Sequence, residues 1–262
     1  MRRLHLVELE DQPWFPRPVR DAATAYLRFA MQLSGQTNLL AERLAPALRS
    51  ARETRLLDLC SGGGGPFPAL LDGLAAEGVR ATARLCDRYP NLAALRDVAE
   101  ASGGRVEFVS KPVDATAVPR ELAGFRTLFN SFHHFRPEMA RAILADAVRA
   151  RRPIGVFEVV GREPFILVNI LFAPLVVLLA MPFVRPRRWS WVFFTYVIPL
   201  VPLLILWDGL VSCLRVYSPD ELRELVRGLG DGSWRWEIGR VRFGRIPAHA
   251  TYLIGMPARE AT

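Results

Sequence analysis

Short runs of apolar residues alternate along the middle of the chain with segments in which apolar residues recur every three or four positions. The apolar runs predict strands, which span residues 54–60, 81–86, 105–109, 126–130 and 154–159. The segments with helical spacing lie between them, over residues 66–76, 92–101 and 137–150. Alternating strands and helices predict an α/β domain in which a doubly wound, mostly parallel sheet has helices on both faces.

The two ends of the chain add further elements. Helices are expected over residues 20–34 and 38–49, after a proline-rich stretch at 1–19 that is not expected to be helical. Ser218-Pro219-Asp220-Glu221 has the pattern of a capping box and predicts a helix that reaches about residue 229. Residues 234–243 and 248–256 predict an antiparallel hairpin joined through 244–247, which brings the expected sheet to seven strands.

A long apolar region interrupts the pattern after the fifth predicted strand. Residues 165–184 and 189–207 contain no charged side chain, and each is near the roughly 20 residues of a membrane-spanning helix. Arg185-Pro186-Arg187-Arg188 joins the two segments, and tryptophans stand at their edges. The pattern predicts a hydrophobic helical hairpin at a membrane. A hairpin in one leaflet fits better than a full span, because it returns the arginines to the headgroups. An apolar lid or a dimer interface is the alternative.

These features predict four parts of the chain. Residues 1–53 are expected to form an N-terminal helical cap, and residues 54–162 the first part of the core. Residues 163–212 form the hydrophobic insertion, and residues 213–262 supply the last helix and hairpin that complete the core.

Composition narrows the classes of partner. The net charge is +8, from 34 basic and 26 acidic residues, but no arginine cluster alternates with aromatic residues as a base-stacking platform requires. No nucleic-acid partner is therefore expected, and the basic balance suits anionic lipid headgroups. Cys60, Cys86 and Cys213 have no metal-ligand spacing, so neither a disulfide framework nor a metal site is expected.

The first predicted strand ends in a turn that is rich in glycine. Asp58, Cys60 and Ser61 close the strand, four glycines follow at 62–65, and Pro66 suits the first turn of a helix. A strand, a glycine turn and a helix in this order are typical of a nucleotide-type site at the carboxyl end of a parallel strand. A flexible glycine loop without a ligand is the alternative.

Polar residues follow the other predicted strands at the same edge. Asp87 ends the second strand, where an acid in dinucleotide and nucleoside sites binds ribose hydroxyls. Asp114 follows the third strand and could accept a hydrogen bond from an adenine amino group, and Asn130 closes the fourth. All are expected on the one rim where an open α/β sheet binds its ligand.

Asp58-x-Cys60-x-Gly62-x-Gly64 resembles the first motif of class I S-adenosylmethionine-dependent methyltransferases, with Cys60 where that pattern has its first glycine. The resemblance covers roughly residues 54–160 and 213–257. It implies a Rossmann-like fold, S-adenosylmethionine as cofactor, and methyl transfer. It also implies cofactor-binding positions at Asp58, Cys60, Ser61, Gly62, Gly63, Gly64, Asp87, Arg88, Asp114, Ala115 and Asn130.

Phe132-His133-His134-Phe135 is similar to the segment after the fourth strand in many small-molecule members of that family. His133 and His134 are the candidate general bases, and packing at a helix start is the alternative reading of the pair. Glu158 is a further candidate base and Asp208 could line the acceptor site, and a structural role is the alternative for both. The apolar insertion implies a hydrophobic or lipid-like acceptor and a membrane-associated protein whose core faces the cytoplasm. Two other functions remain open: cyclisation of a polyene or terpenoid by a membrane-bound enzyme of this fold, and a non-catalytic membrane scaffold.

Overall fold

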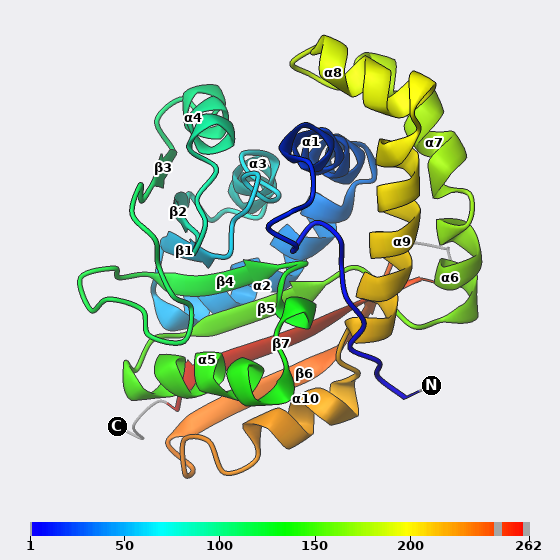
Figure 1. The fold of residues 1–262 in the computed structure, drawn as a ribbon. Helices are drawn as coiled ribbons and strands as arrows, with labels where there is room; N and C mark the ends of the chain where they lie inside the picture. The colour runs from blue at the N-terminus through cyan, green and yellow to red at the C-terminus, as the bar shows by residue number, and fades with distance from the viewer. Residues whose placement is uncertain (1, 244–247, 259–262) are drawn as a thin grey trace.

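The computed structural model describes residues 2–243 and 248–258, and a seven-stranded sheet in the order β3-β2-β1-β4-β5-β7-β6 runs through its centre (Figure 1). Its first five strands are parallel, and β7 is antiparallel to both β5 and β6. The strands are β1 (Arg55–Leu59), β2 (Thr82–Cys86), β3 (Val106–Phe108), β4 (Phe125–Phe129), β5 (Ile154–Glu158), β6 (Trp234–Arg242) and β7 (His249–Pro257). The predicted α/β fold with its terminal antiparallel hairpin is confirmed.

Helices cover both faces of the sheet, which makes it doubly wound. Helices α2 (Gln36–Ala51), α3 (Ala69–Ala76) and α4 (Leu92–Ala101) share one apolar core with the strands. Helices α5 (Pro137–Arg149) and α10 (Pro219–Val226) share the core on the opposite face. Strand β1 lies between β2 and β4 and is buried on both faces, which explains its almost uninterrupted apolar run.

The apolar insertion folds as two bent helix pairs beside the sheet. The first pair is α6 (Pro164–Ile170) and α7 (Ala173–Ala180), which continues into the 3-10 turn η2 (Met181–Phe183); its bend is 49°. The second is α8 (Trp189–Val192) with the π-helical turn η3 (Phe193–Val197), followed by α9 (Leu200–Arg215) after a bend of 76°. Among the described residues no single helix is long and apolar enough to cross a membrane. The two bent pairs meet that criterion only by length and composition.

Helix α1 (Arg17–Leu33) packs against the insertion and lies beside α9 in Figure 1. A third apolar core joins the two parts: Val19 and Tyr26 of α1 cluster with Val177, Trp191 and Val201 of the insertion. The N-terminal helix and the insertion therefore form one packed layer at the side of the sheet.

Several predicted boundaries need correction. The helix expected from Pro66 begins at Ala69, because residues 61–67 form consecutive turns in which the N–H of Gly64 bonds to the carbonyl of Ser61. Helix α1 begins at Arg17, inside the stretch expected to be irregular, because proline is tolerated in a first helical turn. The capping box of α10 is confirmed, although α10 ends at Val226. The predicted hairpin turn at 244–247 lies outside the described residues.

Candidate active site

A buried carboxylate, that of Asp58, holds the glycine turn that follows β1. Asp58 is 1% exposed, and its two oxygens accept hydrogen bonds from the hydroxyls of Thr127 and Ser61, each at 2.8 Å. Burial raises the pKa of Asp58 to about 7, against the lowering effect of those two hydrogen bonds. Asp58 and Ser61 therefore face each other inside the protein and fix the turn to the sheet.

The turn itself leaves room for side chains at only some positions. Cys60 has a φ of 61°, in the left-handed region that the glycine of the family pattern would adopt freely. The pKa of its thiol is raised well above the usual value, first by burial, so the thiol stays protonated. A Cβ on Gly63 would lie 2.2 Å from the methyl group of Thr24, and one on Gly64 would lie 2.5 Å from a methyl group of Val98. The turn is thus wedged between α1 and α4.

Asp87 links the end of β2 to this turn. Its Oδ2 accepts a hydrogen bond from the N–H of Gly62 at 2.8 Å, and its backbone carbonyl accepts one from the N–H of Val113 at 2.9 Å. The next residue, Arg88, forms an ion pair with Asp114 at 3.3 Å. Gly62, Asp87, Arg88 and Asp114, all predicted from the sequence, therefore form one connected group at the carboxyl ends of β1, β2 and β3.

The remaining predicted cofactor residues differ in their surroundings. Asp114 also accepts hydrogen bonds from the backbone N–H and from the hydroxyl of Thr116. The bond from the hydroxyl is the largest cause of the lowered pKa of Asp114. The side chain of Ala115 is buried in the core on the α5 face. Asn130 has a φ of 49°, and its side-chain oxygen accepts the N–H of Val159 at 2.7 Å. Asn130 thus joins the ends of β4 and β5.

His133 lies in the short 3-10 turn η1 (Phe132–His134) and is held by a carboxylate from β5. Its backbone N–H donates to Oε1 of Glu158 at 3.1 Å, and its ring Nδ1 lies 2.7 Å from Oε2 of the same residue. The imidazole side chain is 3% exposed. With Glu158 as the hydrogen-bond acceptor, the ring proton lies on Nδ1, which leaves the lone pair on Nε2.

His134 contacts two acids of the N-terminal segment. Its Nδ1 lies 3.0 Å from Oε2 of Glu8 and 3.2 Å from the carboxylate of Asp11. Burial lowers the pKa of His134, but the hydrogen bond to Asp11 and the charges of Glu8 and Asp11 outweigh it and raise the pKa to about 9. His134 is therefore an imidazolium near pH 7, whereas both histidines were predicted only as possible bases.

One part of this site was not anticipated: the N-terminal segment, residues 4–11, lies along α9. Asp208 accepts two consecutive backbone N–H groups of that segment, at 2.7 and 2.9 Å. Ser212 donates to Oε1 of Glu8 at 3.0 Å, and Arg215 lies 3.1 Å from Oε2 of Glu8. The spacing of Asp208, Ser212 and Arg215, four and then three residues, was the available signal, because it places all three on one face of a helix.

Comparisons with known proteins bear on the fold. No protein-family model matches the sequence, and no curated protein matches it. Among solved structures, the plantazolicin methyltransferase BpumL, in complex with SAH, superposes with a TM-score of 0.51 and 11% identity over 95% of this chain and 94% of that one. The chain has the methyltransferase fold. TnmH superposes with a TM-score of 0.50 and 19% identity, over 92% of this chain and 59% of TnmH.

The mitomycin 7-O-methyltransferase MmcR gives a TM-score of 0.49 at 16% identity, over 85% of this chain and 54% of MmcR. The chain thus spans between half and two thirds of the length of MmcR and TnmH. In the methyltransferase fold observed here, the glycine turn, Asp87 and Asn130 all lie at the carboxyl edge of the parallel strands, which is the ligand-binding edge of open α/β sheets.

Proposed function

We propose that the protein is an S-adenosylmethionine-dependent methyltransferase. The observation that carries the proposal is the hydrogen bond between Asp87 and Gly62, which joins an acid at the end of β2 to the glycine turn after β1. An acid at this position of an open α/β sheet binds ribose hydroxyls, and the turn permits close approach of a ligand to the backbone. The methyltransferase BpumL, which has this fold, was solved with SAH, and this supports the choice of cofactor.

The residues present fit this cofactor. Gly62 is exposed and Asp87 is half-buried, so both can be reached from the sheet edge. Asp87 would bind the ribose, Asp114 the adenine amino group, and the backbone of 62–64 the methionine part, while Asp58 and Ser61 hold the turn. S-adenosylmethionine supplies an activated methyl group, so the chain's main task is to align the acceptor with it.

His133 is the general base in this proposal, for acceptors that must lose a proton. Glu158 fixes the tautomer that leaves the lone pair on Nε2, so His133 can take a proton from a hydroxyl group. His134 is excluded from this role near neutral pH because its pKa of about 9 keeps it protonated. Oε1 of Glu8 lies 3.8 Å from Nε2 of His133, so an acceptor must displace Glu8 to reach it.

The surface of the insertion indicates the class of acceptor. Large apolar side chains stand exposed along α6, α7, α8 and α9, and soluble proteins rarely expose so many together. They include Phe165, Val168, Leu171, Phe172, Leu175, Val176, Leu179, Phe183, Trp189, Val192, Phe193, Tyr196, Val197, Ile198, Leu203 and Trp207. The exposed arginines at 185, 187 and 188 lie within the same insertion. This combination suits an anionic bilayer, and the acceptor would be a hydrophobic or lipid-like molecule taken from it at the cytoplasmic face.

Calorimetry with the full chain tests cofactor binding. S-adenosylmethionine and its demethylated product are expected to bind at one site and to compete with each other, whereas NAD should give no heat of binding. Folded protein that gives no binding heat with either S-adenosyl compound would contradict the proposed function.

Sedimentation with vesicles tests the membrane part separately. Wild-type protein is expected to sediment with vesicles that contain phosphatidylglycerol and less with pure phosphatidylcholine. Replacing Arg185, Arg187 and Arg188 by Gln should reduce partitioning by up to about a hundredfold, since each arginine contributes about 1 kcal/mol at an anionic surface. The same change at the exposed Arg80, Arg96 and Arg120 is the control. If the protein sediments with neither kind of vesicle, the membrane proposal is wrong. Size-exclusion chromatography then shows whether the apolar surface forms a dimer interface or covers a monomer.

A further inference from the structure

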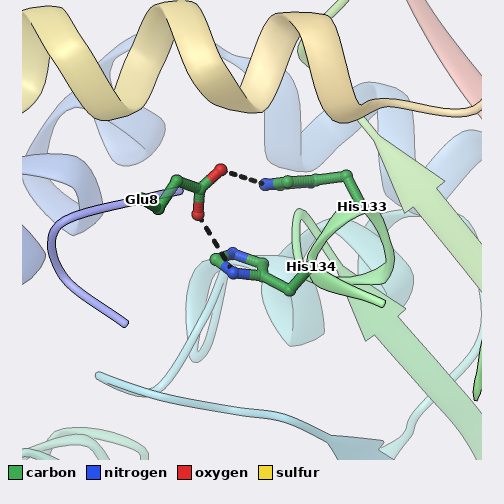
Figure 2. A group of neighbouring side chains, drawn as sticks. All are labelled: Glu8, His133 and His134. Atoms are coloured by element: carbon green, nitrogen blue, oxygen red, sulfur yellow. Dashed lines mark ion pairs between the residues drawn. The ribbon is translucent and has the colours of Figure 1, made fainter. Parts of the chain in front are cut away.

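Three side chains that can bind a metal ion lie close together: Glu8, His133 and His134 (Figure 2). The Glu8 carboxylate reaches from the N-terminal segment towards both rings: Oε1 lies 3.8 Å from Nε2 of His133, and Oε2 lies 3.0 Å from Nδ1 of His134. All three ligand atoms lie within 4.8 Å of one another. Ligand atoms on a tetrahedral zinc ion are about 3.3 Å apart, given bond lengths of about 2.0–2.1 Å. The cluster therefore has the size of a site for one metal ion.

The contacts behind His133 are those of a metal-ligating histidine. Its Nδ1 lies 2.7 Å from Oε2 of Glu158, whose side chain is 4% exposed. Metal-ligating histidines usually donate their second ring N–H to a carboxylate, which fixes the tautomer and makes the ligating nitrogen more basic. In that tautomer the lone pair on Nε2 points towards Oε1 of Glu8, so two electron-rich atoms face each other. A cation between them removes this unfavourable contact.

The charges around the cluster also favour a cation. The carboxylates of Glu8, Asp11, Glu158 and Asp208 gather here, and among the described residues Arg215 is the only arginine with which any of them forms an ion pair. Oε2 of Glu8 is buried without a hydrogen-bond donor in acceptable geometry, although Nδ1 of His134 lies 3.0 Å away and Arg215 3.1 Å away. Arg215 and the protonated His134 together carry two positive charges against these four carboxylates, and a buried charge needs a partner. A divalent ion at the cluster supplies the missing positive charge.

We propose that Glu8, His133 and His134 bind a divalent transition-metal ion, and that Zn²⁺ fits this donor set best. Two imidazoles and one carboxylate are a known zinc ligand set that leaves a fourth position open. Asp11, which lies 3.2 Å from Nδ1 of His134, is the nearest further carboxylate for that position. Binding of the ion displaces the ring proton of His134 to solvent, and the ion then ties the N-terminal segment to the turn after β4. This site could not be predicted from the sequence, because Glu8 is 125 residues away from His133.

The inference goes beyond the proposed methyl transfer and does not depend on it. Nε2 of His133 can take up a proton or bind the ion, but not both at once. The metal-bound and metal-free proteins therefore differ in whether His133 is available as a base. Metal binding and S-adenosylmethionine binding are separate measurements, so either proposal can fail alone.

Titration of the full, tag-free chain with Zn²⁺, after removal of metal with a chelator, tests the site. One ion per chain is expected, and Co²⁺ should give the visible absorption of a four- or five-coordinate ion. Glu8→Gln and His134→Gln should each weaken Zn²⁺ binding at least tenfold. Glu158→Gln should weaken it about 10–100-fold through the lost contact to His133.

His249→Gln, on β7 and outside the cluster, is the matched control and should change the affinity less than twofold. Circular dichroism establishes that each variant is folded, and the Co²⁺ spectrum of the wild-type chain needs no variant at all. Binding of much less than one ion per chain overturns the proposal, as does an unchanged affinity in folded Glu8→Gln protein. If the protein binds S-adenosylmethionine but no metal ion, the metal proposal is wrong and the proposed function is unaffected.

Discussion

The carboxylate of Asp87 accepts a hydrogen bond from the backbone N–H of Gly62, 2.8 Å away, across the ends of two neighbouring parallel strands. This contact fixes the relative position of an acid and a glycine turn, the two features that a nucleoside-type ligand needs at the edge of such a sheet. The other oxygen of Asp87 accepts the N–H of Tyr89 at 2.7 Å, so the carboxylate is oriented from both sides.

Asp87→Ala should weaken S-adenosylmethionine binding at least tenfold, because it removes the acceptor for the ribose hydroxyls. One hydrogen bond to a charged group contributes about 1.5–3 kcal/mol, and the loss of that free energy weakens binding at least tenfold. The measurement is calorimetry on both proteins. Asp72→Ala is the control, since Asp72 is an exposed acid on α3 that pairs with Arg105. Equal affinities in wild-type protein and Asp87→Ala would remove Asp87 from the site.

Gly63→Ala should destabilise the turn, and a second substitution should restore it. The new Cβ would lie 2.2 Å from the methyl group of Thr24 in α1, and such overpacking costs about 1–3 kcal/mol. Thr24→Ser removes that methyl group but keeps the hydroxyl, which donates to the carbonyl of Arg20 at 2.9 Å. The double variant should regain most of the lost stability and cofactor affinity. Failure of Thr24→Ser to rescue would mean that the contact is not the cause.

Asp58→Asn should flatten the dependence of stability on pH. The pKa of Asp58 is about 7 in the folded protein, mainly because of burial, against about 3.9 in an unfolded chain. Folding therefore takes up a proton between these values, so the stability contributed by protonated Asp58 is lost as pH rises from about 4 to about 7. Urea unfolding across this range should show a slope that is smaller in the variant, by at most about 1.4 kcal/mol per pH unit. An unchanged slope would contradict the raised pKa.

Two ion pairs of equal length should differ in their effect on stability. Arg126 and Asp146 pair at 2.7 Å with side chains 2% and 7% exposed, whereas Arg84 and Glu107 pair at 2.7 Å with side chains 43% and 67% exposed. Asp146→Ala leaves a buried guanidinium without its partner and should lower the free energy of unfolding by about 3–5 kcal/mol. Glu107→Ala should lower it by less than about 1 kcal/mol. Similar losses in both variants would contradict this difference in burial.

The sheet could be predicted from the sequence because the residue pattern that indicates each strand lies within that strand. Strands β4 and β5 are buried throughout and β1 from Leu56 onward, and buried parallel strands leave mostly apolar runs in a sequence. The candidate cofactor residues were predicted in the same way. Gly62, Asp87 and Asp114 each follow a predicted strand, and parallel strands bring their carboxyl ends to one edge.

The N-terminal part of the site could not be predicted in this way. Glu8 meets His133 and His134 only because residues 4–11 lie along α9, and that contact joins segments about 200 residues apart. No local pattern encodes such a pairing. The bends in the insertion had a local signal, the prolines that interrupt both apolar segments. Pro174 lies in the first turn of α7, and Pro199 directly precedes α9. Proline lacks the backbone N–H that a continuous helix would need at these positions.

The decisive test of the proposed activity is methyl transfer from S-adenosylmethionine that carries a trideuterated methyl group. Purified protein is incubated with a bacterial lipid extract, and the products are identified by mass spectrometry. Wild-type protein is expected to form a hydrophobic product whose mass has increased by one trideuteromethyl group in place of a hydrogen, and Asp87→Ala should reduce its formation at least tenfold. Protein that binds the cofactor but yields only a product of unchanged mass, or no labelled product from any lipid extract, would contradict the proposed activity.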